Sequence, residues 1–254
     1  MNATSNTVTN ADSGPAARPV REPEGSATAT TTGASAASDA AVVPAPFPAR
    51  LARVAGALGL AHVVLLLAGI AVQDTVLFSD GRDGIAAYAD GILSRTVLGL
   101  YVELVGFLLL LPVLVAVAAM VGRRTDGGRW AARTALLAGV GYVVLTFSPG
   151  IASGAVAMHA VQNGVDVDTA WTMNNLRVVT YVVSLMLLGA HAIGTGMAAV
   201  ADRFGTRTVG WTGIVTGVVL LTAPLLLAPN LHDLTTLVWL LWWAGLCVRL
   251  LRQK

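Results

Sequence analysis

The chain has 254 residues, of which 55% are hydrophobic and 12% charged, and it carries a formal net charge of +2. Soluble domains carry about 25% charged residues, so this composition, with its mean hydropathy of +0.71, excludes a water-soluble globular protein. Several apolar runs approach or exceed the roughly 20 residues that a helix needs to cross a bilayer. We therefore expect a multi-pass membrane protein.

Residues 1–48 differ in composition from the rest of the chain. They hold six of the ten prolines and many alanines, threonines and serines, with Phe47 as the only aromatic residue. Such a segment cannot bury enough apolar surface to offset the entropy of ordering. We predict a disordered cytoplasmic tail.

The remainder, residues 49–254, contains the apolar segments. Within a bilayer every backbone N–H and C=O needs a partner, which favours helices, and these runs lack the alternation of β-strands. The sequence thus predicts an all-α fold, a six-helix transmembrane bundle. Its spans are expected at about 51–72, 96–122, 131–155, 178–200, 208–228 and 233–250.

The arginines gather beside alternate connections of these helices. One side of the predicted bundle would carry Arg50, Arg53, Arg123, Arg124, Arg129, Arg133, Arg203, Arg207, Arg249, Arg252 and Lys254. The opposite side would carry only Arg82, Arg95 and Arg177, among seven aspartates. Basic loops stay in the cytoplasm, so we expect an inner-membrane protein with both termini cytoplasmic.

Away from their ends, the predicted spans hold one carboxyl group and two imidazoles. Glu103 stands in LYVELVGFLLLLPVL (100–114), roughly 10 Å below the outer border at 1.5 Å per residue. His62 and His191 lie mid-span in the first and fourth segments. All three share a helical face with small residues, so we expect them to point at neighbouring helices. They are the candidate intramembrane polar site.

Two roles follow from such a site. Intramembrane ionisable groups often mark a proton or cation pathway. The alternative is a neutral Glu103 hydrogen-bonded to one histidine, which would hold two helices in register. A remote third reading is a b-type haem held by His62 and His191, but six-helix cytochromes usually offer more histidines. We expect no cofactor.

The remaining polar and glycine motifs are better explained by structural roles than by ligand binding. The aspartates of residues 79–84 and 166–168 do not match a calcium loop, so we expect no metal site. Asn174 or Asn175 would cap the fourth helix. The pairs Gly150–Gly154 and Gly213–Gly217 predict close helix contacts within the bundle or a dimer face.

Cys247 is the only cysteine, which rules out an intrachain disulfide, and no HExxH, GxSxG or Walker motif occurs. We expect no enzymatic activity.

RLARVAGALGLAHVVLLLAG (50–69) and GFLLLLPVLVAVAAMVGRR (106–124) resemble a broad set of bacterial integral membrane protein families of unknown function, common in actinobacteria. The resemblance covers roughly residues 50–252. It implies six or seven helices in the inner membrane and assigns no catalytic residue.

The leading functional hypothesis is a small permease-like carrier with its polar site around Glu103. The alternative is a non-transporting membrane-embedded partner or scaffold protein. A carrier would have a cavity toward the acidic side, and a scaffold would have a dry interior and an exposed small-residue stripe such as Gly213–Gly217. The expected partners are the lipid bilayer and other membrane proteins or a second copy of the chain, and not nucleic acid.

Overall fold

The computed structural model describes residues 47–72, 82–84, 93–147, 163–164, 166–204, 207–229 and 231–253. The described residues are helical, apart from short turns and connections, and contain no strand. The all-α prediction is therefore confirmed for this part of the chain. The predicted disordered tail lies outside the described residues, except for its last two positions.

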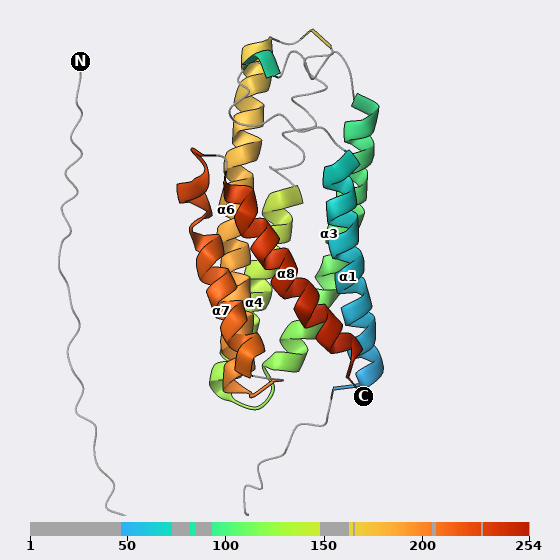
Figure 1. Ribbon diagram of the computed structural model, residues 1–254, viewed down its shortest axis with the longest axis vertical. Coiled ribbons are helices and arrows are strands. Elements are labelled where there is room, and N and C mark those ends of the chain that lie inside the picture. Colours follow the sequence, from blue (N-terminus) through green and yellow to red (C-terminus); the bar gives the residue numbers. More distant parts are fainter. Residues whose placement is uncertain are drawn as a thin grey trace, which may run out of the picture. The chain divides into compact units, whose positions relative to one another are not determined.

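Successive helices run in alternating directions through the unit that extends from Val43 to Lys254 (Figure 1). They are α1 (Ala49–Val72), α3 (Leu93–Val121), α4 (Asp126–Leu145), α6 (Val167–Ala201), α7 (Arg207–Leu221), the 3₁₀ helix η3 (Ala223–Leu226) and α8 (His232–Leu251). The start of α1 and the end of α8 lie at the same end of the bundle.

In the described part of the chain, four helices are long and apolar enough to cross a membrane, as expected for an integral membrane protein: Ala49–Val72, Val97–Val121, Val167–Ala201 and His232–Leu251. Helix α7 is apolar but has only 15 residues. Helix α4 carries Arg129 and Arg133 near its start, which lowers its hydropathy.

Three predicted boundaries were wrong. Helix α6 begins at Val167 and not near residue 178, so Asn174 lies buried within the helix and caps nothing. Helix α4 begins at Asp126, where the Thr125 hydroxyl caps it by accepting a hydrogen bond from Gly128 N–H at 2.9 Å. Helix α7 ends at Leu221, because Pro224 starts a 3₁₀ turn.

Glycines bring neighbouring helices into backbone contact. A Cβ on Gly217 would lie 2.5 Å from the Gly189 carbonyl oxygen, and one on Gly196 would lie 2.5 Å from that of Gly210. The two contacts are two turns apart on both helices, so α6 and α7 run antiparallel in one fixed register. Gly213 lies against Trp242 and the Ala192 carbonyl. The pair Gly213–Gly217 thus makes contacts within the bundle, as predicted.

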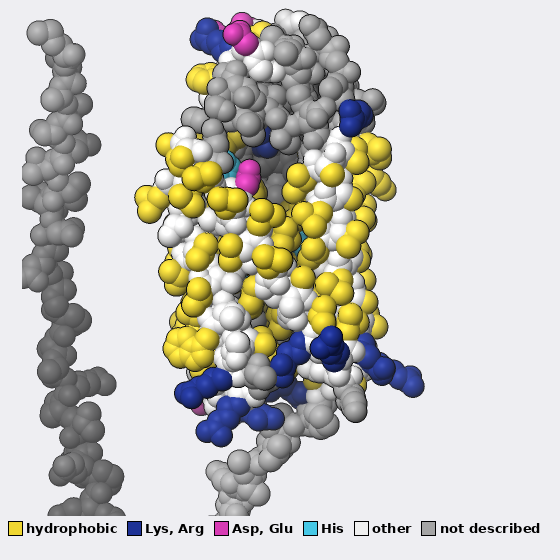
Figure 2. Space-filling model, in the orientation of Figure 1, with side chains coloured by type: hydrophobic (Ala, Val, Ile, Leu, Met, Phe, Trp, Pro, Cys, Tyr) yellow, Lys and Arg dark blue, Asp and Glu magenta, His cyan; other side chains and the backbone are white. Residues whose placement is uncertain are grey.

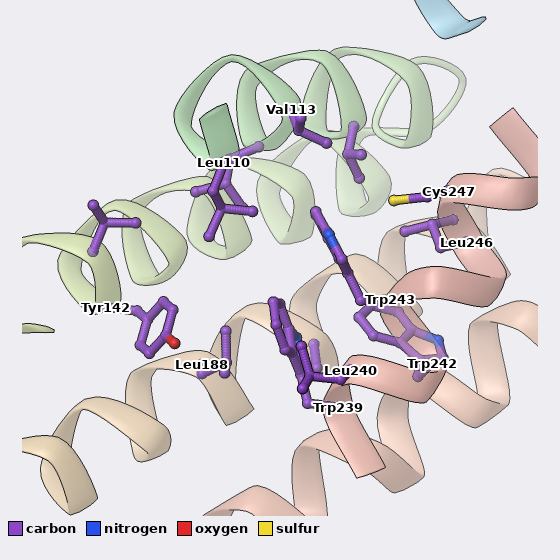
Figure 3. Packing of buried hydrophobic residues seen from close by; sticks show 14 of the residues in the cluster. Leu110, Val113, Tyr142, Leu188, Trp239, Leu240, Trp242, Trp243, Leu246 and Cys247 are labelled. Atoms are coloured by element: carbon purple, nitrogen blue, oxygen red, sulfur yellow. The ribbon is translucent and has the colours of Figure 1, made fainter. Parts of the chain in front are cut away.

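The middle of the bundle is filled by aromatic rings from several helices. Trp239 and Trp243 of α8 stack with ring centroids 5.3 Å apart, and both are fully buried. Tyr142 of α4 and Phe107 of α3 lie against each other at 5.7 Å, and Tyr142 also faces Trp239 at 6.3 Å. Figure 3 shows these indoles among leucines of the neighbouring helices. We call Phe107, Tyr142, Trp239 and Trp243 the aromatic core.

The outer surface has an apolar middle and charged ends (Figure 2). Large apolar side chains are exposed on every helix, for example Leu137 at 75% and Leu241 at 77%. In the described residues, one end carries ten arginines and two aspartates, and the other carries three arginines and four aspartates. We call them the arginine-rich and arginine-poor ends. This pattern is the one expected of a surface that faces lipid between two aqueous layers.

Candidate functional site

Glu103 is buried between α3 and α1 in the arginine-poor half of the bundle, with 9% of its surface exposed. Its side chain packs over Gly69 of α1, where an added Cβ would collide with it and would lie 2.8 Å from the Gly99 carbonyl oxygen. The absence of a side chain at Gly69 therefore makes room for the glutamate. Glu103 faces protein and not lipid, as its neighbouring small residues predicted.

Helix α4 brings two polar side chains toward this carboxyl group. The Tyr142 phenol lies within electrostatic range of Glu103 and beside the Thr146 side chain. The Thr146 hydroxyl donates to the Tyr142 carbonyl oxygen at 2.8 Å and lies 3.3 Å from the Ser184 hydroxyl of α6. The polar groups thus continue from α3 across α4 to α6.

Helices α6 and α8 complete the arrangement. The hydroxyls of Tyr181 and Thr236 are hydrogen-bonded at 2.7 Å, and the Tyr181 phenol also interacts with Asp233 at the start of α8. The Ser184 hydroxyl donates to the Tyr181 carbonyl oxygen at 2.7 Å. His232 packs its ring against Tyr181 at 5.9 Å. Four helices therefore contribute to one buried set of polar groups.

We call this set the inner polar cluster; it comprises Glu103, Tyr142, Thr146, Tyr181, Ser184 and Thr236. It offers one carboxyl group, two phenols and three aliphatic hydroxyls. Such groups can bind a cation or a small ligand with several hydrogen-bond donors. Tyr142 belongs to both the inner polar cluster and the aromatic core. The aromatic core therefore lies directly beside the cluster, on the side of the arginine-rich end.

His62 lies on α1 and does not bond to Glu103. Its Nδ1 donates to the Gly106 carbonyl oxygen of α3 at 2.8 Å, and its fully buried Nε2 has no hydrogen-bond partner among the described residues. Its ring contacts Phe107 at 5.6 Å and Trp239 at 6.0 Å. His62 therefore joins α1 to α3 and borders the aromatic core.

His191 makes the same kind of contact elsewhere in the bundle. Its Nδ1 donates to the Ala135 carbonyl oxygen of α4 at 2.9 Å, and its ring lies 5.6 Å from Trp243. The predicted hydrogen bond from Glu103 to a histidine is thus not formed by either residue.

The two histidines do not form a haem site. Each contacts a different indole of the stacked Trp239–Trp243 pair, and that pair fills the centre of the bundle between them. A porphyrin held by both Nε2 atoms would need the space that these side chains occupy. No group of three or more His, Cys, Asp or Glu in the described ranges could hold a metal ion.

Sequence reasoning identified Glu103 but missed most of the inner polar cluster. Tyrosine, threonine and serine occur throughout membrane helices, and only the rotation of each helix decides which of them meet. One signal was available in the sequence. Tyr142 lies four residues before Thr146, and Tyr181 lies four residues before Leu185, so each tyrosine shares a helical face with a residue that is buried in the bundle.

A second buried carboxylate lies at the arginine-rich end, outside the spans. Asp202 follows α6 and accepts hydrogen bonds from the N–H groups of Arg123, Arg124 at 2.8 Å and Thr125 at 3.0 Å, and from the Thr125 hydroxyl at 2.7 Å. Burial of Asp202 acts to raise the pKa of its carboxyl, but these hydrogen bonds outweigh it and leave the pKa below its ordinary value.

Comparisons of this chain with protein family models, with curated proteins and with solved structures found no match.

Proposed function

We propose that this chain is a six-pass protein of a bacterial inner membrane that acts as a small permease-like carrier, with its ligand site at the inner polar cluster. The observation that carries the proposal is a continuous set of polar groups on four helices: it begins at the Glu103 carboxyl and the Tyr142 phenol and continues through the hydroxyls of Thr146 and Ser184 to those of Tyr181 and Thr236. Buried polar groups in a membrane are costly, which favours a functional role for so many of them in one place.

The chemistry of the cluster favours a small cation or a proton. Glu103 supplies the carboxyl oxygen acceptors, and the phenols of Tyr142 and Tyr181 extend the polar surface toward Asp233. The stacked indoles beneath the cluster favour a barrier to passage toward the arginine-rich end in this conformation. A carrier needs both a site and such a barrier, which a conformational change then opens.

The alternative function, a membrane-embedded partner or scaffold, has less support. The stripe expected to dock another protein, Gly213–Gly217, is packed against α6 and Trp242. The proposal of a non-enzymatic protein rests on the sequence motifs described above.

Cysteine labelling would test whether the cluster opens to water. In a Cys247→Ala background, Ser184→Cys introduces a thiol into the cluster, and Leu188→Cys places one a turn deeper in the apolar core. Both positions are fully buried in the closed conformation, so a membrane-impermeant thiosulfonate applied outside should modify only Ser184→Cys. Equal protection of both thiols would contradict a carrier that opens at this site.

Proton flux into proteoliposomes supplies the second measurement. Glu103→Gln should abolish the flux, because the amide cannot exchange a proton. Asp83→Asn removes an exposed carboxylate from the same end and should leave the flux unchanged. An unaltered flux in Glu103→Gln, or no flux in the unsubstituted protein, would overturn the proton pathway.

A further inference from the structure

A cavity opens at the arginine-rich end, between the last turns of α8 and the residues that follow α6. It encloses about 520 Å³. Its lining consists of Phe204, Gly245, Val248, Arg249, Arg252 and Gln253. Gly245 forms part of its floor, since a Cβ added there would meet no atom within 4 Å.

The lining combines positive charge with an apolar wall. Arg249 and Arg252 are three residues apart on α8 and therefore point to the same side, where Gln253 adds an amide. Phe204 and Val248 supply apolar surface, and no carboxylate is present among the described residues of the lining. Asp202, two residues before Phe204, is not among the described lining residues, and its carboxylate accepts four hydrogen bonds from the α3–α4 connection.

The position of α8 along α7 determines where the cavity lies along the length of the bundle. The Trp242 indole N–H donates to the Val209 carbonyl oxygen at 3.4 Å, so this turn of α8 lies level with the start of α7, and Gly245 and Arg249 follow about one and two turns farther along α8. Trp211 and Trp130 are 52% and 66% exposed near the starts of α7 and α4. Exposed indoles at helix ends mark the membrane–water interface, which is where lipid headgroups lie.

We propose that this cavity binds the headgroup of an anionic phospholipid. The guanidinium groups of Arg249 and Arg252 bind the phosphate oxygens, and a guanidinium offers paired donors that match them. The apolar wall of Phe204 and Val248 lies beside the first carbons of the acyl chains. A phosphodiester with an attached apolar chain can contact both the guanidinium groups and the apolar wall, whereas free phosphate can contact only the guanidinium groups.

The inference rests on the membrane placement proposed above and is independent of the ligand at the inner polar cluster. It can therefore fail while the carrier function stands, and the reverse also holds. Lipid binding by purified protein in detergent separates the two, because it requires neither transport nor an oriented membrane.

The test measures retention of added phosphatidylglycerol by the full-length protein in detergent, with native mass spectrometry as the readout. Phosphatidylcholine and inorganic phosphate are the comparison ligands. The double variant Arg249→Gln, Arg252→Gln should bind phosphatidylglycerol roughly tenfold to thirtyfold more weakly, since each arginine near a headgroup contributes about one decade or less. Gly245→Leu keeps both charges but places an isobutyl group inside the cavity, and it should also weaken binding.

Arg133→Gln, Arg207→Gln is the matched control, because it removes two exposed arginines from the same end outside the cavity. It should retain phosphatidylglycerol as the unsubstituted protein does. If both double variants lose phosphatidylglycerol binding equally, the effect is a general attraction between charges, and the proposed binding site is wrong. Tight binding in Gly245→Leu, or equal binding of inorganic phosphate, would also overturn the site.

Discussion

At the scale of single residues, Asp202 is the best-defined electrostatic feature of the molecule. Its buried carboxylate binds the backbone at the start of α4, where the free N–H groups and the helix dipole both favour a negative charge. One side chain at the end of α6 thereby fixes the position of the α3–α4 connection. The charge on the carboxylate is required for this role, because it accepts four hydrogen bonds and donates none.

The stability of the protein should therefore depend on the protonation of Asp202. Because the pKa of this carboxyl is lowered in the folded state, its contribution is present above the unfolded pKa of about 3.9 and disappears as pH falls through the folded value. We expect Asp202→Asn to lower the free energy of unfolding by about 1–3 kcal/mol at neutral pH, through lost charged hydrogen bonds. Thermal unfolding in detergent between neutral and acid pH would measure this.

Asp126→Asn supplies the control for that prediction. Asp126 is exposed and pairs only with Arg129 on the helix surface, a kind of ion pair that contributes little. If the two variants unfold at the same temperature at neutral pH, Asp202 has no special role in holding the connection.

At the scale of helices, backbone contact through glycine determines how α6 and α7 pack. The facing pairs Gly189–Gly217 and Gly196–Gly210 leave no space for side chains between the two backbones. Such contacts replace the hydrophobic driving force that is weak between helices in lipid. The register of the pair therefore depends on the missing side chains.

Replacing each of two glycines with alanine should change the free energy of unfolding in opposite directions. Gly217→Ala puts a Cβ 2.5 Å from the Gly189 carbonyl oxygen and should lower stability by about 1–3 kcal/mol as the helices separate. Gly245→Ala meets no atom within 4 Å and should raise stability by up to about 1 kcal/mol through helix propensity. Thermal unfolding of both variants checks the difference, and a stabilised Gly217→Ala would refute the close contact.

The helix boundaries show what hydropathy can and cannot predict. It located the apolar centre of each helix, because the lipid-facing part must be apolar. It missed the first eleven residues of α6, where Asp168 and Arg177 suggested a loop. In the structure Asp168 pairs with Arg82 at 2.7 Å, and Arg177 donates to Asn174 at 3.0 Å, so the polar segment remains helical. Pairing of polar groups between distant segments cannot be read from the local sequence.

At the scale of the whole molecule, the uneven distribution of arginine defines how we expect the bundle to lie in the membrane. The described ends of α1 and α8 meet at the arginine-rich end (Figures 1 and 2). Six alternating helices would bring both termini to that side. Among the described residues, four of these helices have the length and the apolar composition of a membrane span.

Reporter fusions would test the orientation. Green fluorescent protein fused after Lys254 should fluoresce, and alkaline phosphatase at the same place should be inactive, because the arginine-rich end is expected in the cytoplasm. The reverse pattern should hold for fusions placed after Asp83, in the connection at the other end. Active phosphatase at the C-terminus would contradict the proposed orientation.

The candidate site was only partly predictable for a related reason. Glu103 stands out because a carboxyl group in an apolar run is rare. Its neighbours in the cluster, such as Tyr142 and Ser184, come from different helices and are ordinary residues in their own segments. Their meeting depends on the relative rotation of three helices, and that in turn follows from contacts like the one between Gly69 and Glu103.

Helix α8 has a consequence for the order of assembly. Pairs of helices that are consecutive in the chain, α1 with α3, α4 with α6 and α6 with α7, pack extensively, so they can associate soon after insertion. Trp239 and Trp243 lie on α8, which follows these helices in the chain, and they join His62 of the first pair to His191 on α6. The bundle interior therefore stays incomplete until α8 has packed against the helices that precede it.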